Sequence, residues 1–275
     1  MTLTSLPTRI DEYPTSERQA LDHCSELGVL APIGLDELNE RAALQTRVDR
    51  KYLVPLTETP HLVRAVAGVA AALEIDGRRD FAYASLYFDT PDLVSYRLAA
   101  HRRRRRFKIR TRTYVDTASC WLEVKTRGGR ASTVKQRVPY LLEHHASIQP
   151  GLSFVEQTLA AAEIPHAPGL DLRPTLATTY RRSTLFFPRS CSRATIDTDL
   201  VWEDGVGGRL RLRSYAVVET KTGSTPSSTD RLLWRHGVRP VRLSKYGTGM
   251  AALHTDLPAT PWRRVLDRHV VRAAS

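Results

Sequence analysis

A row of cations with a two-residue spacing is the feature of this sequence that could do chemistry. Residues 107–114 read FKIRTRTY. In an extended strand, successive side chains point to opposite faces, so Lys108, Arg110 and Arg112 lie together on one face. Arginine binds phosphate oxygens through paired hydrogen bonds, and lysine acts as a point charge. The row therefore indicates anion binding if it is enclosed, and a solvated basic surface if it is exposed.

The next segment repeats this arrangement and adds a carboxylate to the row. Residues 121–125 read WLEVK, which places Glu123 and Lys125 on one face and apolar residues on the other. A short connection around Asp116 and Thr117 predicts that the two segments form a β-hairpin. A carboxylate among cations can hold Mg²⁺ or Mn²⁺ through its oxygen atoms.

The composition favours an anionic partner. The chain has 41 Lys and Arg against 29 Asp and Glu, a formal net charge of +12. Such a surplus indicates nucleic acid, a lipid headgroup or a polyanionic small molecule. No stretch approaches the roughly 18–20 uninterrupted apolar residues that cross a bilayer, and no secretion signal begins the chain. We therefore expect a cytoplasmic protein, with reduced thiols at its three widely spaced cysteines.

Extended segments with one charged face recur along the chain, and helical patterns separate some of them. Within residues 193–200, alternation places Arg193, Asp197 and Asp199 on one face and Leu200 on the other. Thr59 and Pro60 predict the start of a helix whose apolar stripe runs through Leu73. The strands are expected in residues 47–54, 83–89, 107–114, 121–125, 133–139, 176–187, 193–200 and 210–221. Further helices are expected in residues 35–44, 153–162, 227–237, 250–253 and 258–275.

About eight such strands predict a large antiparallel sheet in an α+β fold. An open sheet would expose its charged faces to water, whereas a closed sheet would line a tunnel with them. Barrels of about eight strands can close around side chains or one small ligand. An enclosed row of cations needs carboxylates, water or a bound anion to offset its self-repulsion.

The series of motifs resembles the VTC domain, the catalytic domain of the vacuolar transporter chaperone polyphosphate polymerase. This family belongs to the triphosphate tunnel metalloenzyme (CYTH-like) superfamily. The resemblance runs from about residue 35 to 255, with eight motifs in the same order. They are Arg47-x-Asp49-x-Lys51, Lys108-x-Arg110-x-Arg112, Glu123-x-Lys125, Lys135-x-Arg137, Tyr180-x-Arg182, Arg193 before Ile196-Asp197-Thr198-Asp199, Glu219-x-Lys221 and Ser244-Lys245-Tyr246.

The resemblance implies a closed antiparallel β-barrel, a triphosphate tunnel of about eight strands with helices packed outside. It implies transfer of the γ-phosphate of ATP to a polyphosphate chain with release of ADP, assisted by Mn²⁺ or Mg²⁺. The tunnel domain would span residues 35–256, between a flexible arm at 1–34 and a basic tail at 257–275. ATP and polyphosphate would be the partners, without specific nucleic acid. The oligomeric state stays open, with a monomer as one option.

The same resemblance assigns roles to individual residues. The phosphate-binding cations that it implies fall into a catalytic group and a second group that binds substrate phosphates. The catalytic group is Lys51, Arg110, Arg112, Lys125, Arg182, Arg193 and Lys245. The second group is Lys108, Lys135, Arg137, Lys221 and Arg242. Glu219 is the implied metal ligand, and alternation adds Glu123 and Asp197 because they share the inward face.

One departure from the superfamily pattern bears on the reaction. Superfamily triphosphatases begin with a Glu-x-Glu-x-Lys strand, whereas this chain has Arg47 and Asp49 at the first two positions. The difference favours the polymerase branch and leaves fewer metal ligands. Phosphoryl transfer asks the protein mainly to hold phosphates in line and to neutralise charge. The attacking group would be a terminal phosphate oxygen in a polymerase and water in a hydrolase.

Three functions therefore remain open from the sequence. The first is a metal-dependent polyphosphate polymerase. The second is a tunnel-type triphosphatase that hydrolyses nucleoside triphosphate or inorganic triphosphate. The third belongs to another class, a non-catalytic protein that binds polyphosphate or nucleic acid. The aromatic residues Tyr52, Trp121 and Tyr180 are interpreted as packing residues. Asp89 is interpreted as a turn residue.

Overall fold

One curved sheet places the strands with charged rows side by side. The structure, a computed structural model, describes residues 26–41, 48–127, 133–164 and 169–270. Eight strands follow the order β2-β11-β9-β8-β4-β5-β6-β7, and each neighbouring pair is antiparallel. Short strands β1 and β3 pair with each other in parallel, β3 also pairs with β8, and β10 pairs with β9. The bounds are β1 (Ala31–Ile33), β2 (Val48–Pro55), β3 (Ala71–Leu73), β4 (Phe81–Asp89), β5 (Arg106–Tyr114), β6 (Ser119–Arg127), β7 (Thr133–Tyr140), β8 (Arg173–Phe187), β9 (Ser192–Asp204), β10 (Arg209–Arg211) and β11 (Tyr215–Thr222).

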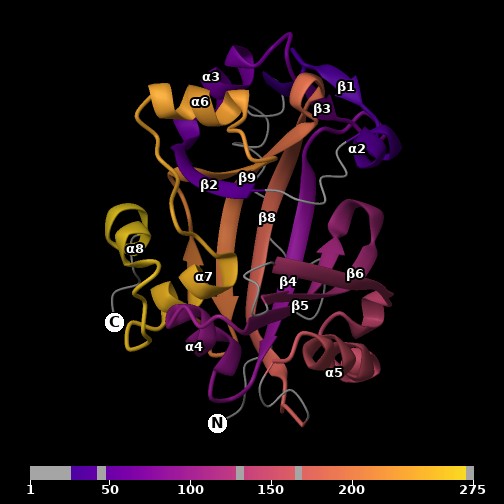
Figure 1. The fold of residues 1–275 in the computed structure, drawn as a ribbon, viewed down its shortest axis with the longest axis vertical. Coiled ribbons are helices and arrows are strands. Elements are labelled where there is room, and N and C mark those ends of the chain that lie inside the picture. Colours follow the sequence, from indigo (N-terminus) through magenta and orange to yellow (C-terminus); the bar gives the residue numbers. More distant parts are fainter. Residues whose placement is uncertain (1–25, 42–47, 128–132, 165–168, 271–275) are drawn as a thin grey trace.

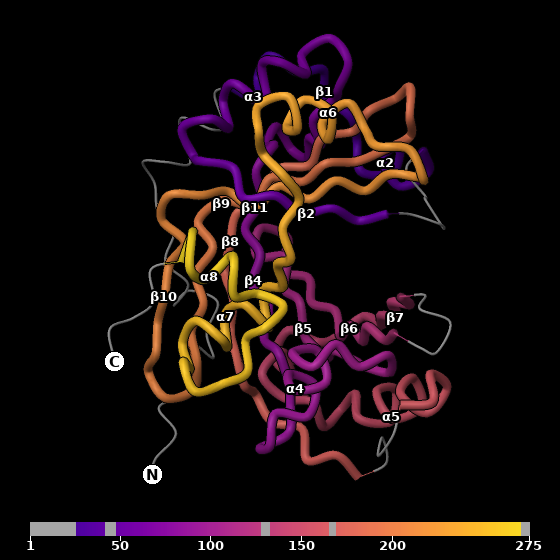
Figure 2. The backbone as a smooth tube through the Cα atoms, turned by 60° about the vertical axis from the view of Figure 1, so that its left-hand side comes forward, coloured from indigo at the N-terminus to yellow at the C-terminus, as the bar shows by residue number. Residues whose placement is uncertain are grey.

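The helices gather in groups around this sheet. Helices α2, α3 and α6 lie near one end of the long strands, while α4, α5, α7 and α8 lie toward the other end (Figures 1 and 2). The α-helices are α2 (Leu35–Arg41), α3 (Thr59–Ala65), α4 (Val94–Ala100), α5 (Leu152–Ala161), α6 (Ser228–Arg235), α7 (Lys245–Leu253) and α8 (Arg263–His269). Short 3₁₀-helices are η2 (Leu56–Glu58), η3 (Val115–Thr117), η4 (Leu142–His144), η5 (Gln149–Gly151) and η6 (Pro188–Ser190).

The curvature of the sheet makes the fold tunnel-like without hydrogen bonds that close it. Backbone pairing runs from β2 to β7, and in the described ranges no pairing joins these two strands. Side chains from β2, β5, β6, β7, β8 and β11 nevertheless line one common cavity. The prediction of an α+β fold with about eight antiparallel strands around a tunnel is thus confirmed, but its closure into a hydrogen-bonded barrel is not.

Apolar side chains bury the outer face of the sheet beneath helices. Phe107 and Ile109 of β5 and Leu122 and Val124 of β6 are buried in one cluster with Val155 and Leu159 of α5. Elsewhere on this outer face, Tyr52 and Val54 of β2 form a cluster with Val63 of α3 and Leu233 of α6. Because side chains alternate, this packing turns the opposite row of each strand to the concave face.

The concave face itself is divided into a charged part and an apolar part. Leu53 lies two residues from Lys51 on β2, and Val217 lies two residues from Glu219 on β11, so each pair shares a face. Leu53 and Val217 belong to a cluster with Met250 and other residues of α7, which fills that part of the interior. The remaining interior keeps the charged side chains.

A β-bulge changes the alternation that the sequence predicts for β9. Asp199 has a positive φ of 54°, and the register between β8 and β9 shifts near Tyr180. Leu200 therefore joins the cluster of Val217, whose strand partner is Asp197, so Leu200 shares the inner face with Asp197. The prediction that Leu200 lies opposite Asp197 is wrong because an extra residue reverses the faces.

The helix predicted from Thr59 through Leu73 is wrong in its second half. Helix α3 ends at Ala65, its N-cap is Glu58 rather than Thr59, and residues 71–73 form β3. Gly68 adopts φ 78°, a conformation that favours glycine and turns the chain after the helix. The apolar run that follows fits both periodicities, and its pairing with β1 and β8 selects the strand.

Other element boundaries differ from the sequence prediction in smaller ways. Helix α5 begins at Leu152, one residue before the predicted start, with Gly151 at its N-cap and no side-chain cap. Helix α6 does carry a capping box, between Ser227 and Asp230. The extended segment predicted over residues 210–221 is divided into β10 and β11. Helix α7 begins at Lys245, five residues before the predicted start.

Residues near both ends of the described chain pack against the sheet. Within the range expected to be a flexible arm, Leu27, Leu30 and Ile33 are buried. Within the range expected to be a basic tail, Val265 and Leu266 of α8 are buried in the cluster of α7. No helix in the part of the chain that the structure describes has the length and apolar character needed to span a bilayer.

Candidate functional site

A central cavity of about 190 Å³ collects most of the predicted site residues. It is lined by nine cations and three carboxylates, together with a few neutral side chains. The cations are Lys51, Lys108, Arg110, Arg112, Lys125, Lys135, Arg182, Lys221 and Lys245, and the carboxylates are Asp49, Glu123 and Glu219. Such a surplus of positive charge in a partly enclosed volume favours the binding of a polyanion.

The β5–β6 hairpin forms one wall of this cavity. In its register Arg110 lies opposite Glu123, and Lys108 lies opposite Lys125, so the two charged rows meet on one face. The apolar rows of both strands are buried under α5. The sequence leaves open whether this hairpin is exposed or enclosed, and in the structure most of its charged face is partly or fully buried, whereas Lys125 is exposed.

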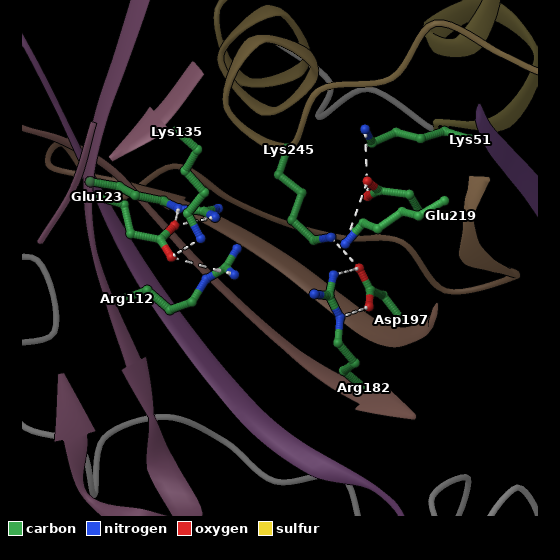
Figure 3. A network of polar contacts seen from close by, with 10 residues as sticks. Lys51, Arg112, Glu123, Lys135, Arg182, Asp197, Glu219 and Lys245 are labelled. Carbon is green, nitrogen blue, oxygen red and sulfur yellow. Dashed lines mark hydrogen bonds and ion pairs between the residues drawn. The ribbon is translucent and has the colours of Figure 1, made fainter. Parts of the chain in front are cut away.

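Glu123 is the anchor of the cations on this wall (Figure 3). Its Oε2 accepts hydrogen bonds from Nε and Nη2 of Arg110 at 2.8 and 2.6 Å. Its Oε1 lies 2.5 Å from Nζ of Lys135 and 3.9 Å from Nη1 of Arg112. Burial would raise the pKa of Glu123, but these cations hold it well below its usual value. The carboxylate therefore stays ionised and fixes the positions of three cations.

Asp197 does the same for a second group of cations. It lies behind the cavity and accepts hydrogen bonds from Nε and Nη2 of Arg182 at 2.6 and 2.8 Å. Nζ of Lys245 donates to the same carboxylate, and this ammonium lies 4.1 Å from the ring centre of Tyr180. Although burial opposes ionisation, Arg182 and Lys245 lower the pKa of Asp197 to about 2. Arg182 and Lys245 are thus held toward the cavity from its opposite wall.

Glu219 is more open than the other two predicted metal ligands. Its Oε2 lies 3.5 Å from Nζ of Lys51, and its Oε1 lies 3.9 Å from Nζ of Lys221. Burial alone would raise its pKa, but Lys51 and Lys221 help to hold the pKa well below the usual value. Asp49, which faces Lys221 in the register of β2 and β11, lines the cavity beside it.

The donor set fits a divalent metal only in part. Both oxygens of Glu123 and of Asp197 already contact guanidinium or ammonium groups at 2.5–2.8 Å, whereas the lysines beside Glu219 lie at 3.5 and 3.9 Å. Among the described residues, no three acidic, histidine or cysteine side chains gather as a metal cage. Glu219, with Asp49 nearby, does fit the usual mode of Mg²⁺ binding, in which one or two carboxylates act together with substrate phosphates. We therefore assign Glu123 and Asp197 to the positioning of cations.

Two lysines of the cavity have strongly lowered basicity. Burial, with Lys125 and Lys51 nearby, lowers the pKa of Lys108 to about 7. Burial likewise lowers the pKa of Lys135 to about 8, against the opposing effect of Glu123. Lys108 Nζ donates to Oγ of Ser244 at 2.7 Å. Burial is thus the main cause of both shifts, and at Lys108 the neighbouring cations add to it.

Besides Asp197, three predicted phosphate-binding cations lie outside the lining of this cavity. Arg193, on β9, faces Lys221 of β11 in the strand register. Arg137 is exposed, and its guanidinium lies 4.3 Å from the ring centre of Trp121. Arg242 is exposed and lines a different groove. Strand alternation and motif order do not distinguish these positions from those that face the cavity.

The structure also adds residues that the sequence did not place at the site. Tyr87 lines the cavity, and its hydroxyl accepts a hydrogen bond from Arg110 at 3.0 Å. Ser244 contacts Lys108 and also caps α7 by accepting a hydrogen bond from Gly247 N. Asp49 belongs to the motif Arg47-x-Asp49-x-Lys51, but the resemblance assigns it no role at the site. Ser244 could have been found as an N-cap before Lys245, since serine is preferred there.

The chain is similar to a known domain family and to solved structures. The sequence model of the VTC domain matches residues 46–254, more than half of the chain. A Hippeastrum protein described as having a dominant triphosphatase activity is 14% identical, with 78% of this chain and 99% of that chain covered and a TM-score of 0.48. A candidate adenylate cyclase from Bacillus halodurans is 13% identical, with 72% and 94% covered and a TM-score of 0.47. No curated protein sequence matches the chain.

Proposed function

The chain belongs to the VTC domain family, and we propose that it is a metal-dependent polyphosphate polymerase that transfers the γ-phosphate of ATP to a polyphosphate chain. The observation that carries this proposal is the cavity with nine cations and three carboxylates. ATP and polyphosphate both present chains of phosphate oxygens to such a surface. A cytoplasmic location, where ATP is available, is part of the proposal.

The residues of the cavity can divide the work of phosphoryl transfer between them. Arg110, Arg112 and Arg182 bind phosphate oxygens as planar forks, and Lys51 and Lys125 add point charges. These groups hold the donor and acceptor phosphates in line and neutralise charge that develops on the transferred group. Glu219, with Asp49, would hold Mn²⁺ or Mg²⁺, which would supply further neutralisation of phosphate charge.

No protein nucleophile is needed for this reaction. A terminal oxygen of the acceptor chain forms the new P–O bond to the γ-phosphorus as the bond to the β-phosphate oxygen breaks, and ADP leaves. The carboxylates Glu123 and Asp197 keep the cations in position before substrate arrives, so little reorganisation is needed. Water in place of the acceptor oxygen would give hydrolysis instead.

Product analysis tests the proposal directly. The purified protein is incubated with ATP and Mn²⁺ or Mg²⁺, and the products are resolved by gel electrophoresis and by assays for ADP and free phosphate. Long phosphate chains with stoichiometric ADP support the polymerase. ADP with free phosphate alone, or no turnover, would overturn it. The hydrolytic result would favour the triphosphatase.

A single substitution connects the activity to this cavity. Glu219→Gln removes the carboxylate that we assign to the metal while it keeps the size of the side chain. We expect metal-dependent turnover to fall by roughly 100-fold or more, with an unchanged far-UV spectrum. The matched control is Glu203→Gln, which removes a partly exposed carboxylate of β9 that lies 3.9 Å from Arg209. Full activity of Glu219→Gln would contradict the site assignment.

A further inference from the structure

We propose that a groove beside the central cavity is a second polyanion site, which binds the part of a linear polyphosphate chain that extends beyond the cavity. The groove has a volume of about 720 Å³ and lies between the loop of residues 237–242, α8 and Arg102. The identity of the ligand rests on the proposed function, but the site itself rests on the geometry below.

The charges that line the groove have one sign. Five arginines line it, from three separate parts of the chain, and no described aspartate or glutamate does so. All five are exposed, so their side chains are available to a ligand. The five are Arg102 after α4, Arg239 and Arg242 in the loop before α7, and Arg264 and Arg268 on α8.

This arrangement is unfavourable for the protein without an anion. Arg264 and Arg268 are four residues apart on α8, where like charges repel. Asp267 lies between these two arginines on α8, but it is not part of the groove lining. A concave surface with five guanidinium groups is suited to phosphate oxygens, which accept paired hydrogen bonds from arginine.

The loop before α7 is a wall of both the groove and the cavity. Arg239 and Arg242 line the groove, whereas Leu243 and Ser244 line the cavity. Val241 N donates a hydrogen bond to Lys51 O at 2.7 Å, which fixes this loop against β2. Figure 2 shows the chain that connects α6 to α7 and contains this loop. The two sites are therefore separated by only a few residues.

Cations also connect the two sites along the end of β5. Lys108 lines both the cavity and a small neighbouring pocket that includes Arg106 and Arg127. Burial and the proximity of Arg127 and Arg242 lower the pKa of Arg106, so these guanidinium groups lie near one another. Positive charge thus continues from Lys108 through Arg106 to Arg242 at the groove. One extended anion could contact all of it.

Polyphosphate fits the groove better than nucleic acid does. Proteins that bind single-stranded nucleic acid use aromatic side chains on which bases stack. Tyr215 is the only aromatic residue other than histidine in the described lining, and its ring packs edge-on against His269 at 4.8 Å. The groove therefore offers contacts to phosphate groups but little to bases.

A charge-reversal pair tests the groove separately from the cavity. The double variant Arg239→Glu/Arg268→Glu is compared with Arg189→Glu/Arg231→Glu, which changes the net charge equally at exposed positions outside both lining sets. Affinities for long-chain polyphosphate and for tripolyphosphate are measured at several salt concentrations. We expect the groove variant to lose roughly tenfold in affinity for the long chain and to show a shallower salt dependence. Its affinity for tripolyphosphate should match that of the control.

Each other outcome has a defined meaning. Equal loss in both double variants would overturn the groove, because net charge alone would explain it. Equal loss for the long chain and for tripolyphosphate would show that the groove is not a separate site. Tighter groove-dependent binding of a single-stranded oligonucleotide than of polyphosphate would overturn the ligand assignment. If the wild-type protein makes no polyphosphate but the groove variant still loses long-chain affinity, the polymerase proposal fails and the groove stands.

Discussion

Carboxylates in and behind the wall of the cavity allow cations to be brought together before any substrate is present. Glu123 contacts Arg110 and Lys135, and Asp197 contacts Arg182 and Lys245. Each carboxylate offsets part of the repulsion and fixes the direction of its partners. The offset is incomplete, because nine cations and three carboxylates line the cavity, and nearby cations add to burial in lowering the pKa of Lys108. The excess charge is what a bound phosphate chain would neutralise.

Binding of a polyanion should therefore draw protons into the cavity. The pKa of Lys108 is about 7, so most of this amine is neutral at about pH 8 in the free protein. A bound anion favours the charged form and raises that pKa. We expect uptake of about one proton for each tripolyphosphate bound at about pH 8. Calorimetric titration in two buffers with different ionisation enthalpies measures this number.

The conservative variant Lys108→Arg is the control for this proton. Arginine stays charged at all of these pH values, so the variant should take up about one proton fewer than the wild type. Its affinity should also fall less steeply between about pH 7 and 9. Equal proton uptake by the two proteins would assign the proton to another group and refute this role of Lys108.

At the scale of elements, strand alternation predicts which face of the sheet a side chain occupies where this depends on local sequence alone. The rows of β5 and β6 could be assigned to faces because strands have a period of two and one row was apolar. The bulge at Asp199 could not be assigned, since its positive φ arises from the way β8 and β9 pair across the sheet. The positions of Arg193 and Arg242 likewise depend on tertiary packing. Motif order alone therefore assigned three cations to the cavity that do not line it.

Helix α7 shows a second limit of local reasoning. Gly247 and Gly249 lower helix propensity, yet α7 begins before them at Lys245 rather than at the predicted residue 250. In the structure, a Cβ at Gly247 would lie 2.1 Å from Trp262, and a Cβ at Gly249 would lie 2.1 Å from Trp202. The glycines allow two tryptophans to pack against the helix. Close packing fixes α7, and with it the position of Lys245.

A methyl group at Gly249 should consequently disturb the site from a distance. Gly249→Ala forces Trp202 away from α7, and Trp202 Nε1 donates a hydrogen bond to Lys245 O at 2.7 Å. We expect a loss of about 1–3 kcal/mol in the free energy of unfolding, as overpacking usually costs, together with weaker tripolyphosphate binding. Chemical denaturation and a binding titration measure both effects.

The matched variant is Gly34→Ala, because a Cβ at Gly34 would meet no atom within 4 Å. Its stability and its affinity for tripolyphosphate should stay close to those of the wild type. Gly249→Ala with unchanged stability would show that α7 can shift without cost, and unchanged binding would show that Lys245 does not depend on this packing.

At the scale of the whole molecule, the charged cavity lowers the stability of the free protein. One part of the interior is filled by the cluster around α7, while the other part holds cations that outnumber their carboxylates. Burial lowers the pKa of Lys108, Lys125, Lys135 and Lys245 below the values in an unfolded chain. The fold is thus prepared for a ligand rather than optimised for its own stability.

The free protein should for this reason become more stable as pH rises above neutral. The folded-state pKa of Lys108 is about 7 and that of Lys135 is about 8. The unfolded lysines have a pKa of about 10.4, so between these values the unfolded state binds more protons and stability increases with pH. The carboxylates that contact these cations, Glu123, Asp197 and Glu219, have lowered pKa values and stay ionised across this window, so they add no slope. We expect the melting temperature to rise from about pH 7 to about pH 9.5, by a few degrees for each kcal/mol gained.

Tripolyphosphate should reverse this dependence, because a bound anion raises the lysine pKa values and stabilises the folded state most where the lysines are charged. Thermal unfolding with and without the anion, at matched ionic strength, measures both slopes. Lys108→Met removes one of the titrating groups, so the ligand-free slope should become shallower in that variant while its melting temperature near neutral pH rises. A ligand-free melting temperature that falls between about pH 7 and 9.5 would mean that the folded protein binds more protons than the unfolded chain in this window. The carboxylates would then more than offset the burial and mutual repulsion of the lysines, and the cavity would not be strained in the free protein.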